Sequence, residues 1–266
     1  MRYFVRIGYN GYSYRGWQRQ PNVPTIQETI EYCISKILRQ PITCIGCGRT
    51  DAMVHASQYY FHFDFYDGWD FDLMFRLNKT LPNDISIFEI IPMDGYPHAQ
   101  TNAISRTYDY LIHTNKDPHL SELSSLYPQN IDIKQMHNAV MLIPSHSDFI
   151  NFCLCPTNHR STHCRVSSAK IFVHRTGNMV RFQITSNRFL QGMVRLLVQG
   201  LIDVGSGELS LKQFEALLNT SEPNIKNKPA YPQGLYLSEV KYPFIDKPKE
   251  SPFFSLLNYS DWEELK

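Results

Sequence analysis

Hydrophobic and polar residues alternate at the start of the chain, and this period of two predicts a β-strand over residues 2–8. Further strands are predicted at 42–47, 59–65, 84–91, 106–114, 166–174, 178–186 and 234–242. Apolar residues spaced three and four apart predict helices instead at 26–39, 71–78, 131–143, 189–203 and 211–218. Strands and helices mixed in this order are typical of an α+β protein.

Local signals mark the ends of several predicted helices. Capping boxes are formed by Thr25 with Glu28 and by Ser210 with Gln213. Gly205 and Gly207 are predicted to stop the helix over 189–203, because glycine favours the left-handed conformation found at helix C-termini.

The order of elements also predicts the domain organisation. The first elements run strand, helix, strand, strand, helix, strand, which is the split βαβ or ferredoxin-like order, and a similar order recurs after residue 115. We therefore expect two ferredoxin-like (RRM-like) halves, residues 1–115 and 116–243. They are expected to form one continuous, mostly antiparallel sheet with helices on one face and a central cleft. Residues 244–266 are expected to be a peripheral tail.

Composition and charge narrow the class of protein. Of 266 residues, 42% are hydrophobic and 19% charged, which is a globular composition and excludes a disordered chain. No run of about 18 apolar residues occurs, and the alternating start lacks the apolar core of a signal peptide, so we expect no membrane span and a cytoplasmic protein. A net charge of +1 argues against a surface covered in basic patches, but it permits a local basic cleft that binds phosphates.

A carboxylate next to a guanidinium, in the stretch GRTD, is the first candidate for chemistry. Aspartate often caps a turn or a helix, and Asp51 could do so here. Alternatively, Gly48 permits a tight approach of the backbone, and Arg49 or another cation keeps Asp51 ionised. An ionised, partly desolvated aspartate is a candidate nucleophile or general base. The residues alone leave both interpretations open.

An arginine stands inside the apolar stretch FLQGMVRLLVQGLI. Gln191, Arg195 and Gln199 are four residues apart, so they could form the solvated stripe of a helix. If the helix is buried, however, Arg195 needs an anionic partner, because an unpaired buried charge costs several kcal/mol. Asp51 would be such a partner.

Two tyrosines, Tyr108 and Tyr110, share one side of the predicted strand 106–114. Such residues usually belong to a half-buried core. A tyrosine on an open sheet face could instead stack on a nucleobase.

Cysteine and histidine suggest an alternative, a zinc-binding RNA or DNA module. The candidate ligands are Cys44 and Cys47, with Cys153, Cys155, His159, His163 and Cys164. Against zinc, the CxxC motif runs directly into GRTD, and the second cluster lacks a further pair at zinc-finger spacing. In a cytosolic chain we expect reduced thiols and no metal.

Several motifs together carry a family resemblance. They are YNGYSYRGWQRQ (9–20), GRTDAMVHA (48–56), LNKTLPNDI (77–85), RTYDY (106–110), HSDF (146–149), NRFLQGMVRLLVQGLIDVGSGELS (187–210) and GLYL (234–237). In this order and at these distances, the chain resembles tRNA pseudouridine synthases of the TruA family from about residue 2 to residue 242.

The resemblance implies an enzyme that isomerises uridine to pseudouridine in the anticodon stem-loop of tRNA (tRNA positions 38–40), without a cofactor and as a homodimer. Asp51 would act at the ribose C1′, by covalent addition or by proton abstraction. Arg195 would be its ion-pair partner, and Tyr108 would stack on the flipped base and assist proton transfer. The remaining residues expected to bind the RNA are Arg49, Arg106, Phe189 and Leu235.

The chain departs from the family at three positions. Met53 stands where the family usually has glycine, Gln100 where it often has arginine, and Cys47 where it has alanine. None of these is Asp51, Arg195 or Tyr108, so the departures bear on substrate range more than on activity. Two related alternatives remain: a tRNA-binding paralogue with weak catalysis, and a synthase with altered RNA specificity.

Overall fold

The computed structural model describes residues 1–220, 228–246 and 261–266. The chain forms two compact units, a first unit of Met1–Ile104 with Tyr236–Ser255 and a second unit of Ser105–Leu235 with Leu256–Lys266. This division differs from two halves that meet at residue 115. The strand that follows Ile104 starts the second unit, and the last long strand belongs mainly to the first.

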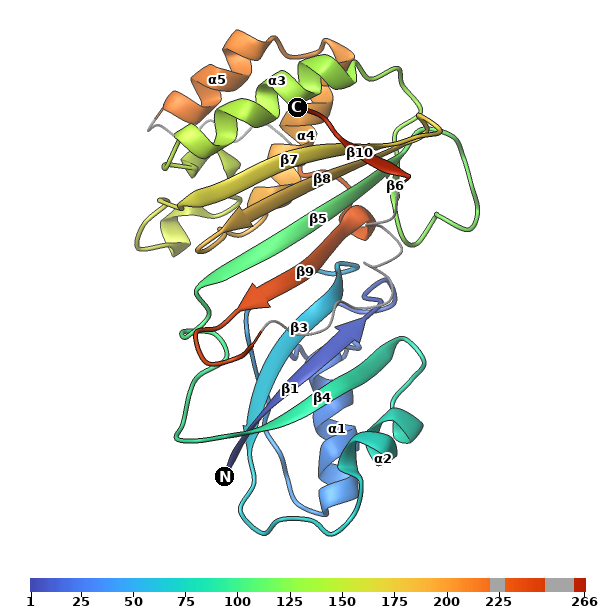
Figure 1. Cartoon of the computed structure of the whole chain (residues 1–266), viewed down its shortest axis with the longest axis vertical. Coiled ribbons are helices and arrows are strands. Elements are labelled where there is room, and N and C mark those ends of the chain that lie inside the picture. Colours follow the sequence, from blue (N-terminus) through green and yellow to red (C-terminus); the bar gives the residue numbers. More distant parts are fainter. Residues whose placement is uncertain (221–227, 247–260) are drawn as a thin grey trace. The chain divides into compact units, whose positions relative to one another are not determined.

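The first unit is a small sheet with two helices. Its elements are β1 (Arg2–Tyr9), α1 (Ile26–Leu38), β2 (Ile45–Gly46), β3 (His55–Asp64), α2 (Leu73–Thr80), β4 (Ile85–Met93) and β9 (Leu235–Lys241). The strand order is β9-β3-β1-β4, with β2 added on β3 (Figure 1). Strand β1 runs antiparallel to both β3 and β4, whereas β9 is parallel to β3. The buried side of α1, with Ile26, Ile30 and Ile34 fully enclosed, supplies much of the core.

The second unit also consists of a sheet with helices packed on it. Its elements are β5 (Ser105–His113), β6 (Ser125–Leu126), α3 (Ile133–Leu142), β7 (Val166–His174), β8 (Met179–Ser186), α4 (Met193–Ser206), α5 (Leu211–Asn219) and β10 (Trp262–Glu264), with short 3₁₀ turns at Ile143–Ser145, Ile150–Phe152, Pro156–Asn158 and Pro232–Gly234. The strand order is β10-β7-β8-β5, and β6 lies parallel to the end of β5 (Figure 1). The long ladders are antiparallel. Helix α3 packs beside α4 and α5.

The predicted α+β class, with a mixed and mostly antiparallel sheet, is confirmed. A central cleft stays a prediction. Most of the expected tail, residues 244–266, lies outside the described residues. Near its end, strand β10 pairs with β7. In the described part of the chain, no helix is long and apolar enough to cross a membrane.

Helix α4 corrects the sequence prediction at both ends. It begins at Met193, not at 189, and it continues through Gly205 to Ser206. A Cβ atom at Gly205 would lie 2.5 Å from Cγ2 of Ile131, so this glycine permits close packing and does not stop the helix. Gly207, with φ +81°, is the C-cap. Of the two predicted stops, only the second is correct.

The predicted capping boxes are present to different degrees. At α5, the Ser210 side chain accepts from Gln213 N–H and the Gln213 side chain accepts from Ser210 N–H, which completes the box. At α1, Thr25 Oγ1 accepts from Glu28 N–H at 3.4 Å.

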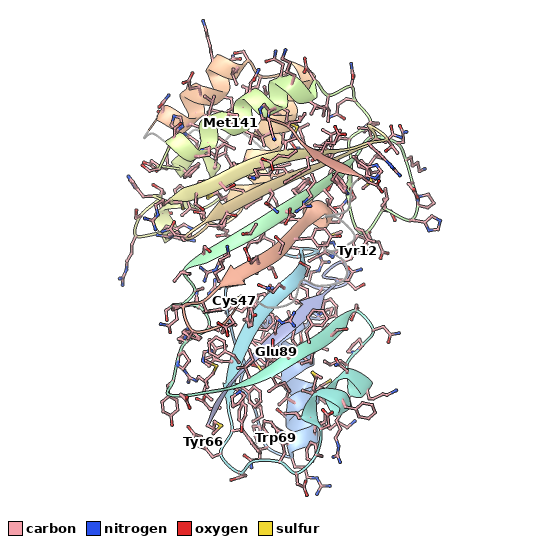
Figure 2. The ribbon with its side chains drawn as sticks, in the orientation of Figure 1. Tyr12, Cys47, Tyr66, Trp69, Glu89 and Met141 are labelled. Atoms are coloured by element: carbon pink, nitrogen blue, oxygen red, sulfur yellow. The ribbon has the colours of Figure 1, made fainter. Side chains whose placement is uncertain are left out.

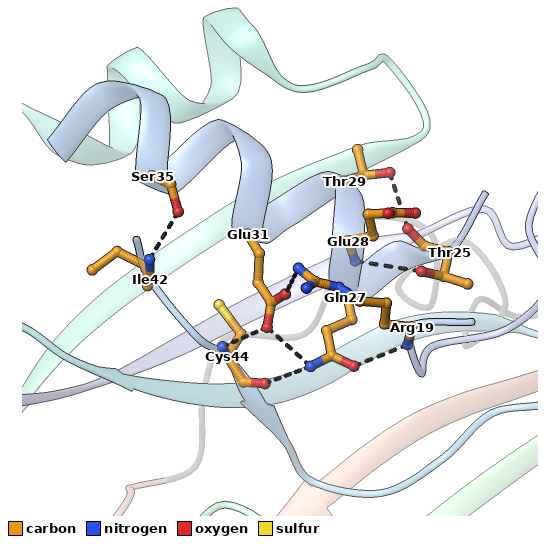
Figure 3. A network of polar contacts seen from close by, with 9 residues as sticks. All are labelled: Arg19, Thr25, Gln27, Glu28, Thr29, Glu31, Ser35, Ile42 and Cys44. Atoms are coloured by element: carbon orange, nitrogen blue, oxygen red, sulfur yellow. Dashed lines mark hydrogen bonds and ion pairs between the residues drawn. The ribbon is translucent and has the colours of Figure 1, made fainter. Parts of the chain in front are cut away.

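The predicted strand 42–47 shortens to β2, because its first residues bond to α1 and not to a strand (Figure 3). The side chain of Glu31 on α1 is buried, and it accepts a hydrogen bond from Cys44 N–H at 2.8 Å and from Gln27 Nε2 at 2.9 Å. Gln27 Nε2 also donates to Cys44 O at 3.0 Å, and the Arg19 guanidinium pairs with the Glu31 carboxylate. One buried carboxylate thus fixes the segment that leads toward Asp51.

Replacing Glu31 with alanine should lower the free energy of unfolding by about 2–4 kcal/mol, because the buried Cys44 N–H loses its acceptor and the Arg19 guanidinium loses its partner. Urea denaturation measures this change. The control is Glu264→Ala, which removes a surface pair with Lys170 and should lower stability by less than about 1 kcal/mol. Equal losses in the two variants would contradict the structural role of Glu31.

Candidate active site

Asp51 lies on a loop between β2 and β3, where no helix begins, so it is not a helix N-cap. Its carbonyl oxygen accepts from Val54 N–H at 3.3 Å, which closes a tight turn. Met53 in this turn has φ +64°, the left-handed conformation. The Asp51 side chain is half-buried, whereas Arg49 is exposed.

A second loop, residues 9–17, holds the Asp51 loop on both sides. Trp17 N–H donates to Thr50 O at 3.3 Å, and Met53 N–H donates to Tyr14 O at 3.1 Å. The Tyr9 hydroxyl bonds to Thr50 Oγ1 at 2.9 Å. Because these bonds lie just before and just after Asp51, the backbone of the carboxylate-bearing residue is fixed from both directions.

Two glycines allow the loops to approach this closely. A Cβ atom at Gly11 would lie 1.9 Å from the carbonyl oxygen of Val54. Gly16 has φ +90°, and its Cβ would lie 2.3 Å from the carbonyl oxygen of Thr50. Any larger residue at either position would push the two loops apart.

The second loop is itself anchored to the segment before β4. The Tyr14 hydroxyl donates to Asp84 Oδ1, and Asn10 N–H donates to Asp84 O, both at 2.8 Å. Burial, with the Asp84 carboxylate as a hydrogen-bond acceptor, raises the pKa of Tyr14, so the hydroxyl keeps its proton and donates. Sequence reasoning noted both motifs but gave no role to Tyr14 or Asp84, because the bond joins segments 70 residues apart.

In the second unit, the structure brings together three of the predicted RNA-binding residues. The rings of Tyr108 and Phe189 meet edge to face, with centroids 4.9 Å apart. Arg106 Nη1 donates at 3.4 Å to the carbonyl oxygen of Asn187, two residues before Phe189 in the chain. These contacts form an aromatic and basic group where β5 begins and where β8 ends.

Of the two interpretations of Tyr108 and Tyr110, the half-buried core fits Tyr110. Tyr110, on the same side of β5, is fully buried, and its hydroxyl lies within hydrogen-bond distance of Tyr231 O, at 2.7 Å, and of Ser125 Oγ, at 2.9 Å. Tyr108 is half-buried. This side of β5 is therefore core at Tyr110, and a base could contact it only at the Tyr108 end.

Arg195 is the third residue of α4, between the buried residues Val194 and Leu196. Its Nε donates to Ala230 O at 2.7 Å, and its own carbonyl accepts from Ala230 N–H at 3.0 Å. Arg195 is half-buried, so it does not belong to a fully solvated stripe. The two bonds to Ala230 hold the Arg195 backbone and the Nε of its guanidinium.

The cysteines do not favour the zinc interpretation. Burial raises the pKa of the Cys44 thiol well above its ordinary value, which disfavours the thiolate that zinc requires. Within the described residues, no three His, Cys, Asp or Glu side chains are grouped closely enough to hold a metal ion. Cys47, at the end of the CxxC motif, is fully buried and its N–H donates to Tyr60 O (Figure 2).

A surface hollow of about 610 Å³ lies elsewhere in the first unit, near the C-terminal end of α1. Its lining combines cations and aromatic rings, namely Lys36, Arg39 and Arg76 with Phe65, Trp69 and Phe71 (Trp69 is labelled in Figure 2). None of the predicted site residues contributes to it, so the hollow is separate from the Asp51 loop.

Comparisons with known proteins agree with the motifs. The sequence profile of a family described as tRNA pseudouridine synthase matches residues 140–243. Proteins named tRNA pseudouridine synthase A from Porphyromonas gingivalis and Azobacteroides pseudotrichonymphae are each 39% identical, over 91% of this chain and 97% of their own length. The protein of that name from Streptococcus pneumoniae is 30% identical, over 91% of this chain and 98% of its own length.

The class of protein that these matches define is an RNA-modifying isomerase. The chain belongs to the tRNA pseudouridine synthase A family. The roles of individual residues stay predictions. Leu235, for example, is only 6% exposed at the start of β9, so most of its surface is unavailable to RNA.

The departure at Met53 has a measurable consequence. A left-handed conformation costs a residue with a Cβ about 1–2 kcal/mol, and glycine avoids this cost but loses about 0.5–1 kcal/mol of chain entropy. Met53→Gly should therefore change the free energy of unfolding by less than about 1 kcal/mol and leave activity intact. Met53→Val should lower it by about 1–2 kcal/mol, because a β-branched residue tolerates positive φ poorly. Thermal denaturation distinguishes these outcomes, and equal stability of the two variants would contradict the strained turn.

Proposed function

We propose that this protein converts uridine to pseudouridine in the anticodon stem-loop of tRNA, with Asp51 acting at C1′ of the ribose. Its relatives carry the name tRNA pseudouridine synthase A over nearly their whole length. The observation that carries the role of Asp51 is its loop, which is fixed on both sides by backbone bonds to residues 9–17 while the side chain stays partly accessible.

The chemistry requires a base that has left the stack, because its reacting atoms cannot be reached inside a helix. The N1–C1′ bond breaks, the uracil turns, and a C5–C1′ bond forms. The proton on C5 is lost to a base and N1 gains a proton, so the reaction consumes no other reagent. An ionised carboxylate can serve it either by adding to C1′ or by removing a proton from the ribose.

Arg195 is the proposed partner that keeps Asp51 ionised. A guanidinium presents five N–H donors in a planar arrangement that matches a carboxylate, and the bond to Ala230 uses one of them. An opposite charge close to a partly buried carboxylate favours its ionised form. This pairing would explain why an arginine occupies a mostly apolar helix.

Tyr108 and Phe189 are proposed to hold the detached uracil. Their edge-to-face contact fixes the Tyr108 ring, and an aromatic face can stack on any base. Arg49 and Arg106 are proposed to contact the phosphate backbone, since arginine binds phosphate through paired N–H groups. Leu235 is also proposed to contact the RNA, through the small part of its surface that is exposed. A homodimer that needs no cofactor completes the proposal.

The experiment is to map pseudouridine in total tRNA from cells with and without this protein, and to measure tritium release from tRNA labelled at uridine C5. Pseudouridine that disappears from the anticodon stem-loop, together with tritium release by the purified protein, supports the proposal. Tight tRNA binding without release would indicate a paralogue with weak catalysis. Loss at sites outside the anticodon arm would indicate altered specificity.

A further inference from the structure

The loop that holds the Asp51 turn is closed on a single residue of another segment. Asp84 accepts Asn10 N–H through its carbonyl oxygen and the Tyr14 hydroxyl through its carboxylate, each at 2.8 Å. Between these two points, Tyr14 N–H donates to Gly11 O at 2.9 Å and forms a turn. Residues 10–14 are therefore bound to Asp84 at both ends.

The same short segment makes the contacts with the Asp51 turn. Tyr14 donates through its hydroxyl to Asp84 and accepts through its carbonyl from Met53 N–H at 3.1 Å. Gly11 lies against the Val54 carbonyl and donates its N–H to His55 Nδ1 at 3.1 Å. A shift of the Tyr14 side chain would thus move the carbonyl that fixes the residue two positions after Asp51.

We infer that Asp84, acting through Tyr14, is a positioning residue that holds the Asp51 carboxylate at the place where the ribose of the substrate binds. The inference rests on the proposed function of Asp51. The Tyr14 ring is 6% exposed and Asp84 is half-buried, so this charge-assisted bond is partly shielded from water. Misplacement of a catalytic group by about 1 Å can reduce a rate by roughly 100-fold, so a modest movement of this loop would be measurable.

The test is single-turnover tritium release from tRNA, at saturating enzyme, for Tyr14→Phe, Asp84→Ala and the double variant. We expect each single variant to react about 10- to 100-fold more slowly, with a tRNA Kd within about threefold of wild type. The double variant should be within about twofold of the slower single variant, because both changes break the same bond. Asp84→Asn, which keeps an acceptor oxygen, should recover part of the rate.

The matched control is Tyr242→Phe. Tyr242 is 5% exposed in the same unit, and its hydroxyl donates to Ala99 O, so the variant also loses a buried hydroxyl bond. It should lose thermal stability like Tyr14→Phe but keep the wild-type rate. Equal rate losses in the two variants would show a general effect of destabilisation and would overturn the inference.

Two other results would also overturn it. Rates of the folded Tyr14→Phe and Asp84→Ala proteins within twofold of wild type would show that the bond does not position Asp51. A weaker tRNA Kd with an unchanged saturating rate would show that these residues bind RNA instead. Asp51→Ala is measured alongside: if it is active, the proposed function fails, whereas an inactive Asp51→Ala with fully active Tyr14→Phe refutes the positioning role alone.

Discussion

Replacing Asp51 with asparagine should leave tRNA binding within about threefold of wild type and reduce pseudouridine formation by on the order of 10⁴-fold or more. Asparagine has nearly the same shape as aspartate, so the turn closed by Val54 N–H and the bonds to Tyr14 and Trp17 should persist. The amide has no negative charge and is a poor nucleophile and base, so the step at C1′ loses its reagent.

The measurement combines tritium release from labelled tRNA with a filter-binding assay of the same preparation. Because asparagine can revert to aspartate by deamidation, Asp51→Ala serves as the second variant and should be equally inactive. The control is Asp70→Asn, at an exposed position of the same unit, which should keep the full rate. A rate within tenfold of wild type in Asp51→Ala would exclude Asp51 as the catalytic group.

Gly16 lies outside the predicted catalytic residues, but replacing it with alanine should strongly reduce both stability and activity. Its φ of +90° disfavours any residue with a Cβ, and that Cβ would lie 2.3 Å from Thr50 O and 3.1 Å from the carbonyl carbon of Asp51. We expect a loss of about 2–4 kcal/mol in the free energy of unfolding. We also expect a rate lower by about 100-fold, because backbone atoms cannot move aside without shifting Asp51.

Gly177→Ala is the matched control for this variant. Gly177 has φ +75°, but no described atom lies within 4 Å of where its Cβ would be. It should lose about 1 kcal/mol from backbone strain and keep its activity. If Gly177→Ala lost as much activity as Gly16→Ala, general destabilisation would explain both, and the close approach of the two loops would lose its functional meaning.

The elements with clear periodicity could be predicted, and their ends depended on contacts. Residues 166–174 contain β-branched and aromatic residues that favour a strand, and β7 has these bounds. Helix α4 was placed too early because Phe189 and Leu190 continue the apolar spacing, although they lie in the loop before it. The predicted stop at Gly205 is wrong, because the sequence does not distinguish a glycine that packs closely against Ile131 from a glycine that ends a helix.

In the candidate site, too, some residues could be predicted from the sequence, whereas contacts between distant segments could not. Asp51 could be singled out as a candidate, because a carboxylate beside a guanidinium is visible in the sequence, and its catalytic role stays a prediction. Tyr14 and Asp84 could not be joined, because no periodicity reports a hydrogen bond across 70 residues. The sequence indicates a core position for Tyr110, but it does not show the partners Ser125 and Tyr231, which come from other parts of the chain.

The return of β9 to the first unit has a consequence for synthesis of the chain. Strand β3, which starts four residues after Asp51, pairs with β9 through His55 with Tyr236 and Ala56 with Leu237. Since chains grow from the N-terminus and domains fold as they emerge, the His55–Ala56 end of β3 stays without its partner strand until almost the entire polypeptide has been made. A nascent or truncated product that stops before residue 236 would expose this edge to aggregation.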